Sequence, residues 1–293
     1  MPDVFGFLNI DKPLGITSHD VVHKVRRGLG IKKVGHAGTL DPLATGVLIV
    51  CLGGATRLSE YAMNSTKRYR ARVHLGITTT TYDAEGEVTA ERPIDHFSQN
   101  DVENALQPFL GNIEQIPPMY SAIKQGGRKL YDLARSGETV ERAPRPVRIE
   151  ALEIVDWSPP QFSLDVTCSA GTYIRSLAFD VGEVIGVGAH LAGLVRTASG
   201  AFTLENSINL ETLLADPDWQ RHLLPADYAL ASLPRLDLDA VDSNHILHGR
   251  VPQGDYPAAD GLARAYDFQG RLAAILQSDN GIWRPHKVFL PNE

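Results

Sequence analysis

The segment Gly35-His36-Ala37-Gly38-Thr39-Leu40-Asp41-Pro42-Leu43-Ala44-Thr45-Gly46-Val47-Leu48 places one carboxylate, Asp41, in a loop of small residues directly before an apolar run. Glycine, threonine and proline can hold such a loop in a fixed shape while leaving room for a large molecule to approach. No other Asp or Glu occurs between Asp20 and Glu60, so Asp41 has no acidic neighbour in the sequence. An Asp before a Pro can also cap a turn through its side chain. The segment alone therefore leaves both a catalytic and a structural role open.

The residues that flank this segment are spaced in patterns typical of regular secondary structure. Residues 18–29 predict an amphipathic helix that is capped by Ser18 and stops at Gly30. The apolar run at the end of the segment predicts a short buried strand. Residues 68–75 alternate strictly between basic side chains on one face and apolar side chains on the other, where Tyr69 also lies. Tyr69 could therefore pack in the core or stand beside a basic surface.

The remainder of the chain predicts a mixture of helices and strands. We expect helices at 98–111 and 174–185, a short helix at 191–195, a strand at 162–168, a helical connector at 207–234 and short strands from 235 onward. Residues 116–148 are rich in Gly, Pro, Lys and Arg and show little apolar periodicity, which indicates a long excursion from the core. The frequent turns after residue 235 predict a small β-rich second domain.

Length and composition are those of an ordinary globular protein. The chain has 293 residues, of which 43% are hydrophobic and 22% are charged. Its N-terminus lacks the basic and apolar regions of a signal peptide, and no apolar run reaches the roughly 18 residues that a membrane helix needs. Cys51 and Cys168 lie in apolar runs, which is typical of reduced core cysteines. We therefore expect a cytoplasmic protein without a membrane segment.

Charge is segregated along the chain. The net charge is −7, yet residues 12–72 hold eleven Lys and Arg against three Asp and Glu, and residues 120–150 hold seven against four. Binding to phosphates responds to local potential rather than to net charge, so two basic segments on an acidic body favour a nucleic-acid partner. Tyr120 and Tyr131, within the second basic segment, favour RNA in particular. A solvated basic surface without a partner is the alternative.

Common catalytic and cofactor motifs are missing from the sequence. It contains no phosphate-binding loop of the form GxxxxGK[ST], no GxSxG, no HExxH and no Cys or His spacing typical of a metal site. The glycines at 186–193 do not form GxGxxG after a strand. These motifs therefore give no sign of a phosphate-binding loop, a serine hydrolase, a metal site or a dinucleotide site.

Four blocks of sequence, in this order, resemble the bacterial tRNA pseudouridine-55 synthase family (TruB type). They are Leu8-Asn9-Ile10-Asp11-Lys12-Pro13 with Gly15-Ile16-Thr17-Ser18, the opening segment 35–48, Lys67-Arg68-Tyr69-Arg70, and Gly171-Thr172-Tyr173-Ile174-Arg175-Ser176-Leu177. Two further blocks, 116–122 and 188–191, support the match. The resemblance covers about residues 5–205.

This resemblance implies a mixed α/β (α+β) pseudouridine synthase fold with a central, mixed and largely antiparallel sheet. It implies a catalytic domain at 1–234 with a basic RNA-clasping insertion at about 116–148, followed by a small PUA-like RNA-binding domain at 235–293. The implied activity is isomerisation of uridine 55 in the T-loop of tRNA to pseudouridine, by base flipping, cleavage of the N1–C1′ bond and joining of C5 to C1′. It implies the T-arm of tRNA as the partner, without cofactor or metal. No membrane is expected and no protein partner is implied, so we expect a monomer.

The resemblance also assigns catalytic roles. Asp41 matches the family's catalytic carboxylate, and Arg175 matches the cation that pairs with it and offsets the cost of burying its charge. The carboxylate could stabilise charge at C1′, attack C1′ or attack the pyrimidine ring, and the sequence leaves these routes open. Tyr69 matches the tyrosine that packs on the target base and is a candidate to take the C5 proton. An ordinary tyrosine pKa near 10 makes a poor base, which favours stacking.

Four further matches concern substrate binding. Lys12 matches a lysine that supports the aspartate loop, and His36 matches a residue that contacts RNA where the base is flipped out. Tyr173 and Leu194 match residues that line the base pocket. Thr80 departs from the family, in which an acidic residue is often found near this position. Residues 235–293 match the PUA-like domain only weakly.

Other functions are compatible with parts of the sequence. A non-catalytic tRNA-binding or tRNA-folding protein would keep the fold, but the intact Asp41, Tyr69 and Arg175 argue against it. An aspartate-dependent hydrolase of a small nucleoside or sugar would have no use for the basic insertion. A synthase that acts on another RNA position is harder to separate, because RNA shape governs the choice of target.

Overall fold

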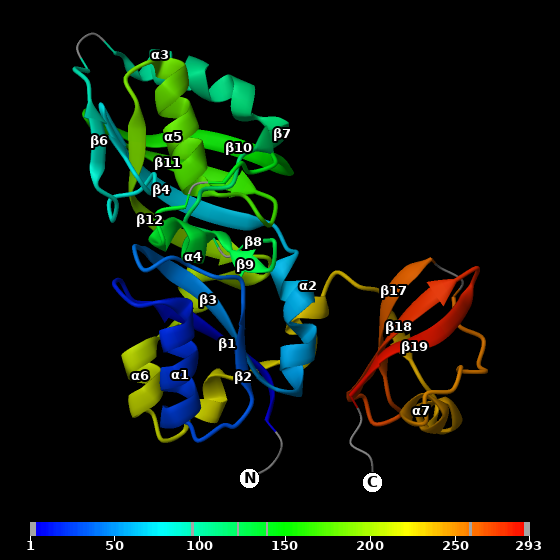
Figure 1. Cartoon of the computed structure of the whole chain (residues 1–293). Helices are drawn as coiled ribbons and strands as arrows, with labels where there is room; N and C mark the ends of the chain where they lie inside the picture. Colours follow the sequence, from blue (N-terminus) through cyan, green and yellow to red (C-terminus); the bar gives the residue numbers. More distant parts are fainter. Residues whose placement is uncertain (1–3, 95–96, 122, 139, 258–259, 290–293) are drawn as a thin grey trace.

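Eleven strands form one large mixed sheet through the body of the protein (Figure 1). The computed structural model describes residues 4–94, 97–121, 123–138, 140–257 and 260–289. The strands are β1 (Phe5–Lys12), β2 (Val34–Ala37), β3 (Ala44–Gly53), β4 (Lys67–Leu75), β7 (Gly111–Gln115), β10 (Arg145–Ser158), β11 (Gln161–Cys168), β12 (Ala189–Ser199), β13 (Phe202–Thr203), β14 (Ile208–Asn209) and β15 (Leu224–Pro225).

The order along the sheet is β14-β1-β3-β12-β4-β11-β10-β7, and β2, β13 and β15 pair beside this path. The pairs β1–β14 and β3–β12 are parallel, and the other pairs of the path are antiparallel. The expected mixed, largely antiparallel sheet is therefore confirmed. A separate hairpin is formed by β5 (Ile77–Thr79) and β6 (Val88–Glu91).

Helices pack at the two ends of the sheet. At one end, α1 (Ser18–Gly28) and α6 (Leu210–Ala215) pack together near β1 and β2, with α2 (Ser59–Met63) close by. At the other end, α3 (Gln99–Leu106) and α5 (Ile174–Ile185) lie against β4, β10 and β12. Each end has its own cluster of buried apolar side chains, and Tyr69 and Leu194 pack against both clusters. These two predicted site residues therefore lie where the halves of the sheet meet.

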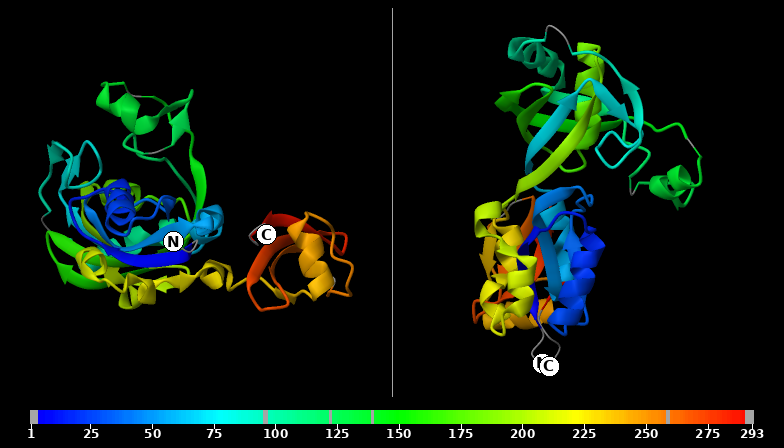
Figure 2. Two further views of the ribbon diagram at one scale, coloured as in Figure 1. Left: turned by 90° about the horizontal axis from the view of Figure 1, so that it is seen from below. Right: turned by 90° about the vertical axis from the view of Figure 1, so that its left-hand side faces the viewer.

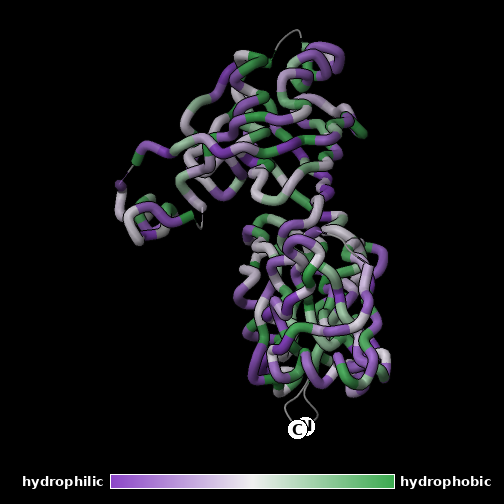
Figure 3. Tube along the Cα trace, turned by 90° about the vertical axis from the view of Figure 1, so that its right-hand side faces the viewer, coloured by the Kyte–Doolittle hydropathy of each residue, from purple (hydrophilic) through white to green (hydrophobic). Residues whose placement is uncertain are grey.

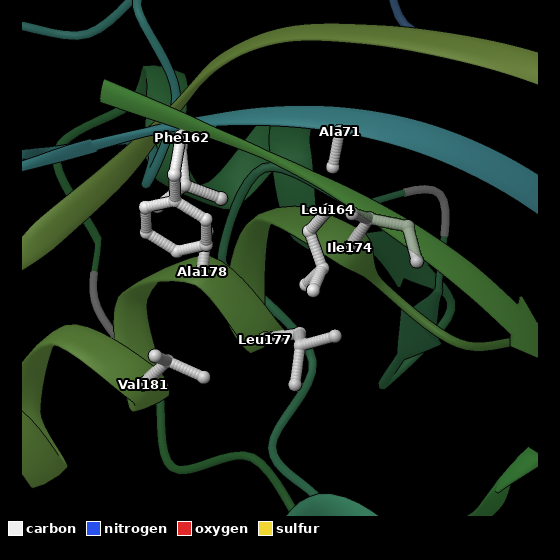
Figure 4. A pocket seen from close by; sticks show the side chains of 8 residues that line it. Ala71, Phe162, Leu164, Ile174, Leu177, Ala178 and Val181 are labelled. Carbon is white, nitrogen blue, oxygen red and sulfur yellow. The ribbon is translucent and has the colours of Figure 1, made fainter. Parts of the chain in front are cut away.

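The contact between α5 and the sheet is a packed apolar core. Figure 4 shows side chains of the helix directed toward side chains of the strands. All eight are buried hydrocarbons, namely Ala71, Val73, Phe162, Leu164, Ile174, Leu177, Ala178 and Val181. Burial of this apolar surface fixes the helix predicted at 174–185, and with it the first turn that carries Arg175.

The helix predicted next to the opening segment is present as α1, but the expected Ser18 cap is wrong. Thr17 is the N-cap, because its hydroxyl accepts the Asp20 N–H and the Asp20 carboxylate accepts the Thr17 N–H. Ser18 is instead buried, and its hydroxyl accepts the Leu40 N–H at 2.8 Å and donates to the Leu40 C=O at 3.0 Å. The helix therefore holds the residue that precedes Asp41.

The short helix predicted at 191–195 is also wrong, since these residues belong to β12. A β-bulge between Leu191 and Gly193 shifts the register of β12 against β4. The extra residue brings Leu191 and Leu194 to the same apolar cluster, and this three-residue spacing imitates a helix in the sequence.

Residues 116–144 leave the sheet between two neighbouring strands. β7 and β10 pair directly, so the chain departs after Gln115 and returns at Arg145. The excursion contains the strand pair β8 (Lys124–Gln125) and β9 (Arg128–Lys129), followed by α4 (Leu130–Arg135). Figure 2 shows α4 projecting from the body, and Figure 3 shows hydrophilic residues along much of the excursion. The expected excursion is thus present, except that its last four predicted residues, 145–148, belong to β10, and that residues 122 and 139 lie outside the described ranges. Its role as an RNA-clasping insertion stays a prediction.

The C-terminal residues form a second sheet of four strands, as the turn pattern predicts. The strands are β16 (Arg235–Asp237), β17 (Gly261–Tyr266), β18 (Leu272–Asp279) and β19 (Ile282–Val288), and α7 (Ala240–Leu247) packs against them. This sheet contacts the body through the Phe5 and Phe289 rings and through an ion pair between Lys287 and Glu60. The domain division at 234/235 and the PUA-like assignment stay predictions.

Cys51 and Cys168 are buried, free thiols, as expected for core cysteines. Over the described ranges, none of the helices has the length and apolar character required to cross a membrane.

Candidate active site

The loop that carries Asp41 is held by hydrogen bonds on both sides. The Ala44 N–H donates to the Asp41 C=O at 3.0 Å, and the Gly15 N–H donates to the Pro42 C=O at 2.9 Å. Together with the Ser18–Leu40 pair, these bonds fix the backbone immediately before and after the carboxylate. The Asp41 side chain is nevertheless 42% exposed, so its carboxylate remains open to an approaching molecule.

Arg175 joins Asp41 to two other parts of the chain. Its Nη2 lies 3.1 Å from the Asp41 Oδ2, and its Nη1 lies 3.4 Å from the Asp83 Oδ2. The same Nη2 donates to the Tyr120 C=O at 2.6 Å, at the root of the 116–144 excursion. The guanidinium is only 7% exposed, so these interactions take place largely out of water. The pairing of Arg175 with Asp41 that the sequence predicts is present in the structure.

Asp83 is a site residue that the sequence analysis missed. Its side chain is 3% exposed, and its Oδ1 accepts hydrogen bonds from the Thr81 hydroxyl at 2.5 Å and from the Glu85 N–H at 3.1 Å. The turn at 82–86 looks like an ordinary polar surface turn in the sequence. Its parallel bridge to Leu191 of β12 brings Asp83 into the core, and only the fold supplies this contact.

The surroundings of Asp41 act on its pKa in opposing directions. Partial withdrawal from water raises the pKa of Asp41, and the nearby charge of Asp83 acts in the same direction. The Arg175 guanidinium opposes both effects, and Lys12 does so to a smaller extent. Arg175 and, to a smaller extent, Lys12 therefore favour the ionised form of the Asp41 carboxylate.

Lys12 binds the turn at 13–16, which in turn contacts the loop that carries Asp41. Its side chain is fully buried, and its Nζ donates to the Pro13 C=O at 2.9 Å and to the Ile16 C=O at 2.7 Å. Burial lowers the pKa of Lys12 to about 8, although the charge of Asp41 acts to raise it. The lysine thus shapes the turn at 13–16, whose Gly15 binds Pro42, and it places a positive charge near the carboxylate.

Tyr69 and Leu194 lie on adjacent strands in the middle of the sheet. In the β4–β12 ladder Leu194 pairs with Ala71, and Tyr69 pairs with Arg196. The side chains of Tyr69 and Leu194 both pack against the apolar clusters at the two ends of the sheet. Burial raises the pKa of Tyr69, and the charge of Arg196 acts in the opposite direction. Asp41 is close enough to act on the pKa of Tyr69 as well.

Tyr173 is the N-cap residue of α5, two positions before Arg175. The amide of Gln115 binds it on both sides, accepting the Tyr173 N–H at 2.8 Å and donating to the Tyr173 C=O at 3.0 Å. Burial raises the pKa of Tyr173, and the charge of Arg175 opposes this. Tyr173 also lines an open pocket of about 390 Å³ at the root of the excursion, whose other lining residues are Ile123, Arg145, Pro146, Val147, Ala170 and Gly171.

His36 lies in β2, at the start of the segment that leads to Asp41. Its ring packs edge-to-face on the ring of His19, with 5.1 Å between the centroids. Burial lowers the pKa of His36 to about 4, so the imidazole is neutral at physiological pH. Of the seven predicted site residues it is the one that shares no charge interaction or apolar cluster with Asp41, Tyr69 or Arg175 in the described structure.

The arrangement combines an open carboxylate, a buried cation that binds it, and an aromatic ring at the centre of the sheet. This set can stabilise or attack an electrophilic carbon and pack against a flat base. No group of three or more His, Cys, Asp or Glu that could hold a metal ion occurs among the described residues.

Comparisons with known proteins address the family directly. Residues 26–174 match the family model described as TruB family pseudouridylate synthase (N terminal domain), and residues 175–231 match the tRNA pseudouridylate synthase B C-terminal domain. The tRNA pseudouridine synthase B of Cupriavidus metallidurans is 46% identical, over 98% of this chain and 94% of that protein. The tRNA pseudouridine synthase B of Symbiobacterium thermophilum is 51% identical, over 85% of this chain and 84% of that protein.

Solved structures agree with this assignment. A chain in the crystal structure of a Cbf5-Nop10-Gar1 complex superposes with a TM-score of 0.75 and 28% identity, and the match covers 98% of this chain and 85% of that chain. The expected fold class and enzyme class are therefore confirmed. The chain belongs to the TruB family of pseudouridine synthases, and it is an isomerase.

Proposed function

We propose that the protein converts uridine 55 in the T-loop of tRNA to pseudouridine, with Asp41 as the catalytic carboxylate. One observation carries the proposal: the Asp41 carboxylate is open to solvent on one side and paired at 3.1 Å with a buried guanidinium on the other. The guanidinium favours the ionised form of this carboxylate, which can still receive a large substrate. The curated relatives named tRNA pseudouridine synthase B support tRNA as the substrate.

The chemistry requires a group of this kind. The N1–C1′ bond of uridine breaks, a C5–C1′ bond forms, and the C5 proton leaves while N1 gains one, so the product is an isomer. The target base lies inside the folded T-loop and must be flipped out before the reaction. Whether Asp41 stabilises charge at C1′ or attacks C1′ or the ring, it acts in its ionised form, which Arg175 favours.

Tyr69 supplies the ring against which the flipped base packs, and Leu194 and Tyr173 line the rest of the base site. Burial raises the pKa of Tyr69 and so disfavours the phenolate, the form that could take the C5 proton, and the charge of Arg196 opposes this effect. Lys12 keeps the aspartate loop in shape, and the neutral His36 contacts RNA beside the flipped base.

The basic surfaces bind the tRNA backbone. The excursion supplies the exposed Lys124 and Arg128, whereas Arg68, Arg70 and Arg72 of β4 are exposed on the face of the sheet opposite Tyr69 and so lie away from the base. Residues 116–148 then act as the RNA-clasping insertion and 235–293 as a PUA-like RNA-binding domain. On this proposal the protein works as a cytoplasmic monomer, without cofactor or metal.

The test is release of tritium from tRNA that carries 5-³H-uridine, because formation of the C5–C1′ bond expels the label. The native chain, Asp41→Ala and Asp165→Asn are compared at one salt concentration. Asp165 is a partly exposed carboxylate paired with Arg70, so its variant is a matched control for loss of one acidic group. We expect release by the native chain and the control, and none by Asp41→Ala. Mapping of the product then identifies the modified position.

Each other outcome has a definite meaning. Release by Asp41→Ala would remove this residue from the mechanism. Binding of tRNA without release by any variant would support a tRNA-binding or folding protein. Pseudouridine at a position other than 55 would keep the reaction and correct the target.

A further inference from the structure

Arg196 is a buried charge to which the proposed function gives no role beyond its effect on the pKa of Tyr69. Its side chain is only 1% exposed and is the largest of the fully buried side chains in the described structure. It lies in β12, where it pairs with Gly46 of β3 on one side and with Tyr69 of β4 on the other. No Asp or Glu within the described ranges forms an ion pair with it.

The partners of Arg196 are backbone carbonyls at both ends of the catalytic loop. Its Nε donates to the Val47 C=O at 2.7 Å, its Nη2 to the Gly38 C=O at 3.1 Å, and its Nη1 to the Thr39 C=O at 3.4 Å. Gly38 and Thr39 come just before Asp41 and Val47 comes after it. One guanidinium therefore bridges the two ends of the loop that carries the carboxylate.

Two glycines of the loop have conformations that suit this contact. Gly38 has φ +96°, and a Cβ atom there would lie 3.6 Å from the Arg196 Nη1. Gly46 has φ +93°, and a Cβ atom there would lie 2.4 Å from the Arg196 carbonyl oxygen, closer than two such atoms can approach. Both backbone conformations favour glycine. At Gly46 the backbone of β12 also leaves no room for a side chain, whereas at Gly38 the positive φ alone favours glycine.

A buried guanidinium without a carboxylate partner is costly for stability. Carbonyl groups satisfy its hydrogen bonds, but an apolar side chain of similar size would avoid the cost of removing the charge from water. Its charge also acts on groups around the site, since it opposes the rise in the pKa of Tyr69 and lowers the pKa of Lys12 and His36. Arg196 thus contacts the loop that carries Asp41, and its charge acts on the pKa values of Tyr69, Lys12 and His36.

We propose that Arg196 is a positioning residue that holds the 38–47 loop, and with it Asp41, in a fixed place relative to Tyr69. The structural part of this proposal stands on the three carbonyl contacts, whereas its effect on reaction rate rests on the proposed function. Arg196 does not touch the substrate, because it lies beneath the loop and is almost completely buried.

The test compares Arg196→Met and Arg196→Lys with Lys67→Met. Lys67 is a suitable control because it is also a buried cation that binds backbone carbonyls, those of Met63 and Ser65, but it lies outside the catalytic loop. Three quantities are measured for each variant: hydrogen exchange of the peptide that covers the loop, the Kd for tRNA, and the single-turnover rate of pseudouridine formation.

For Arg196→Met we expect faster exchange in the loop and a single-turnover rate reduced by about 100-fold, because displacement of a catalytic group by about 1 Å has an effect of that order. The Kd for tRNA should change by less than about threefold, since a buried side chain makes no phosphate contact. Arg196→Lys should recover part of the rate, because an ammonium group can bind some of the carbonyls but not in the planar arrangement of a guanidinium. Lys67→Met should be destabilised while its loop exchange and rate stay near native.

Unchanged exchange in the loop of Arg196→Met would overturn the proposal, whatever the activity. Equal loss of rate in Lys67→Met would show that any lost buried cation on this sheet has the same effect, and would also overturn it. If Arg196→Met does not fold, the loop exchange and the single-turnover rate of Arg196→Lys test the proposal in its place. If the native chain modifies no tRNA, the proposed function fails, yet loop exchange still tests whether Arg196 holds the loop.

Discussion

The catalytic loop at 38–47 and the excursion at 116–144 are both expected to contact RNA, yet they are built in different ways. The loop is bound from beneath by buried polar side chains, Ser18 and Arg196. The excursion is largely exposed over its described residues, and hydrogen bonds join it to the body at its root, where Arg175 donates to the Tyr120 C=O and Ser176 donates to the Ile116 C=O.

The difference follows from what each region must do. A reacting group has to be held within about 0.5 Å of its productive position, which requires buried and well-satisfied contacts. A segment that holds an RNA backbone can adjust its position, because charge–phosphate attraction depends weakly on exact geometry. Arg175 belongs to both regions, since the same guanidinium binds Asp41 and the Tyr120 C=O. The excursion and the carboxylate are thus connected through one side chain.

Removal of this shared side chain should have the largest effect. In Arg175→Met, both Asp41 and the buried Asp83 lose the guanidinium that pairs with them. We expect the single-turnover rate to fall by at least about 10³-fold, and stability to fall by about 3–5 kcal/mol, the usual range for breaking a buried ion pair from one side. Tritium release and urea unfolding measure the two effects.

Arg70→Met is the matched control for this prediction. Arg70 forms a bidentate ion pair with Asp165, but its side chain is 55% exposed. An exposed pair contributes at most about 1 kcal/mol, so stability should change little and the saturated rate should stay near native. Similar losses in the two variants would contradict the distinction between the buried cation and the surface cation.

The second prediction concerns the hydroxyl of Tyr69. Tyr69→Phe keeps the ring that packs on the base and removes only the group that could take the C5 proton. If that hydroxyl is the proton acceptor, the single-turnover rate should fall by about 10²-fold or more while the Kd for tRNA stays within a few-fold, since general-base catalysis contributes about that much. Tyr61→Phe, at a ring that packs against Lys287, is the control. A native rate in Tyr69→Phe would leave stacking as the role of Tyr69.

The parts of the site that were predictable from the sequence lie in continuous blocks. Asp41, Tyr69 and Arg175 each stand in a stretch that resembles the family, and alternation along 68–75 correctly separates the basic face from the buried face. Asp83 was missed because its turn carries no apolar pattern, and its burial depends on a bridge to Leu191, more than a hundred residues away. Such a contact exists only in the folded chain.

The errors in secondary structure have a similar cause. Thr17 and Ser18 are equally good caps by residue type, and the choice between them is made by Leu40, which binds Ser18. The apolar residues at 191–195 have helical spacing because a bulge inserts one residue into β12. Arg196 offers no signal at all, since an arginine in a sequence is ordinarily read as a surface residue. In each case a distant partner decides the local structure.

A smaller effect is expected in the excursion. Lys124 is an exposed residue of β8, so Lys124→Gln should remove one phosphate contact without altering the catalytic loop. We expect weaker tRNA binding by a few-fold, and a slope of log K against log salt that is shallower by about 0.7–0.9. The rate at saturating tRNA should not change. Arg221→Gln, in the connector outside both basic segments, is the control, and an equal change in its slope would argue against a specific role for the excursion.

The smallest expected effect is the pH dependence contributed by His36, which lies at the beginning of the rigid segment. Burial lowers the pKa of His36 to about 4 in the folded protein, whereas the unfolded chain has an ordinary histidine pKa near 6.5. Between these two values the unfolded chain binds the additional proton, so the free energy of unfolding decreases as the pH falls from about 6.5 toward 4. His36→Gln cannot bind this proton, and its stability should therefore decrease less between pH 7 and pH 5, as measured by urea unfolding. His286→Gln, at an exposed histidine of β19, should follow the native protein. If the stability of His36→Gln and of the native protein depends equally on pH, the His36 imidazole is exposed to water. The buried part of the segment that leads to Asp41 would then begin only after residue 36.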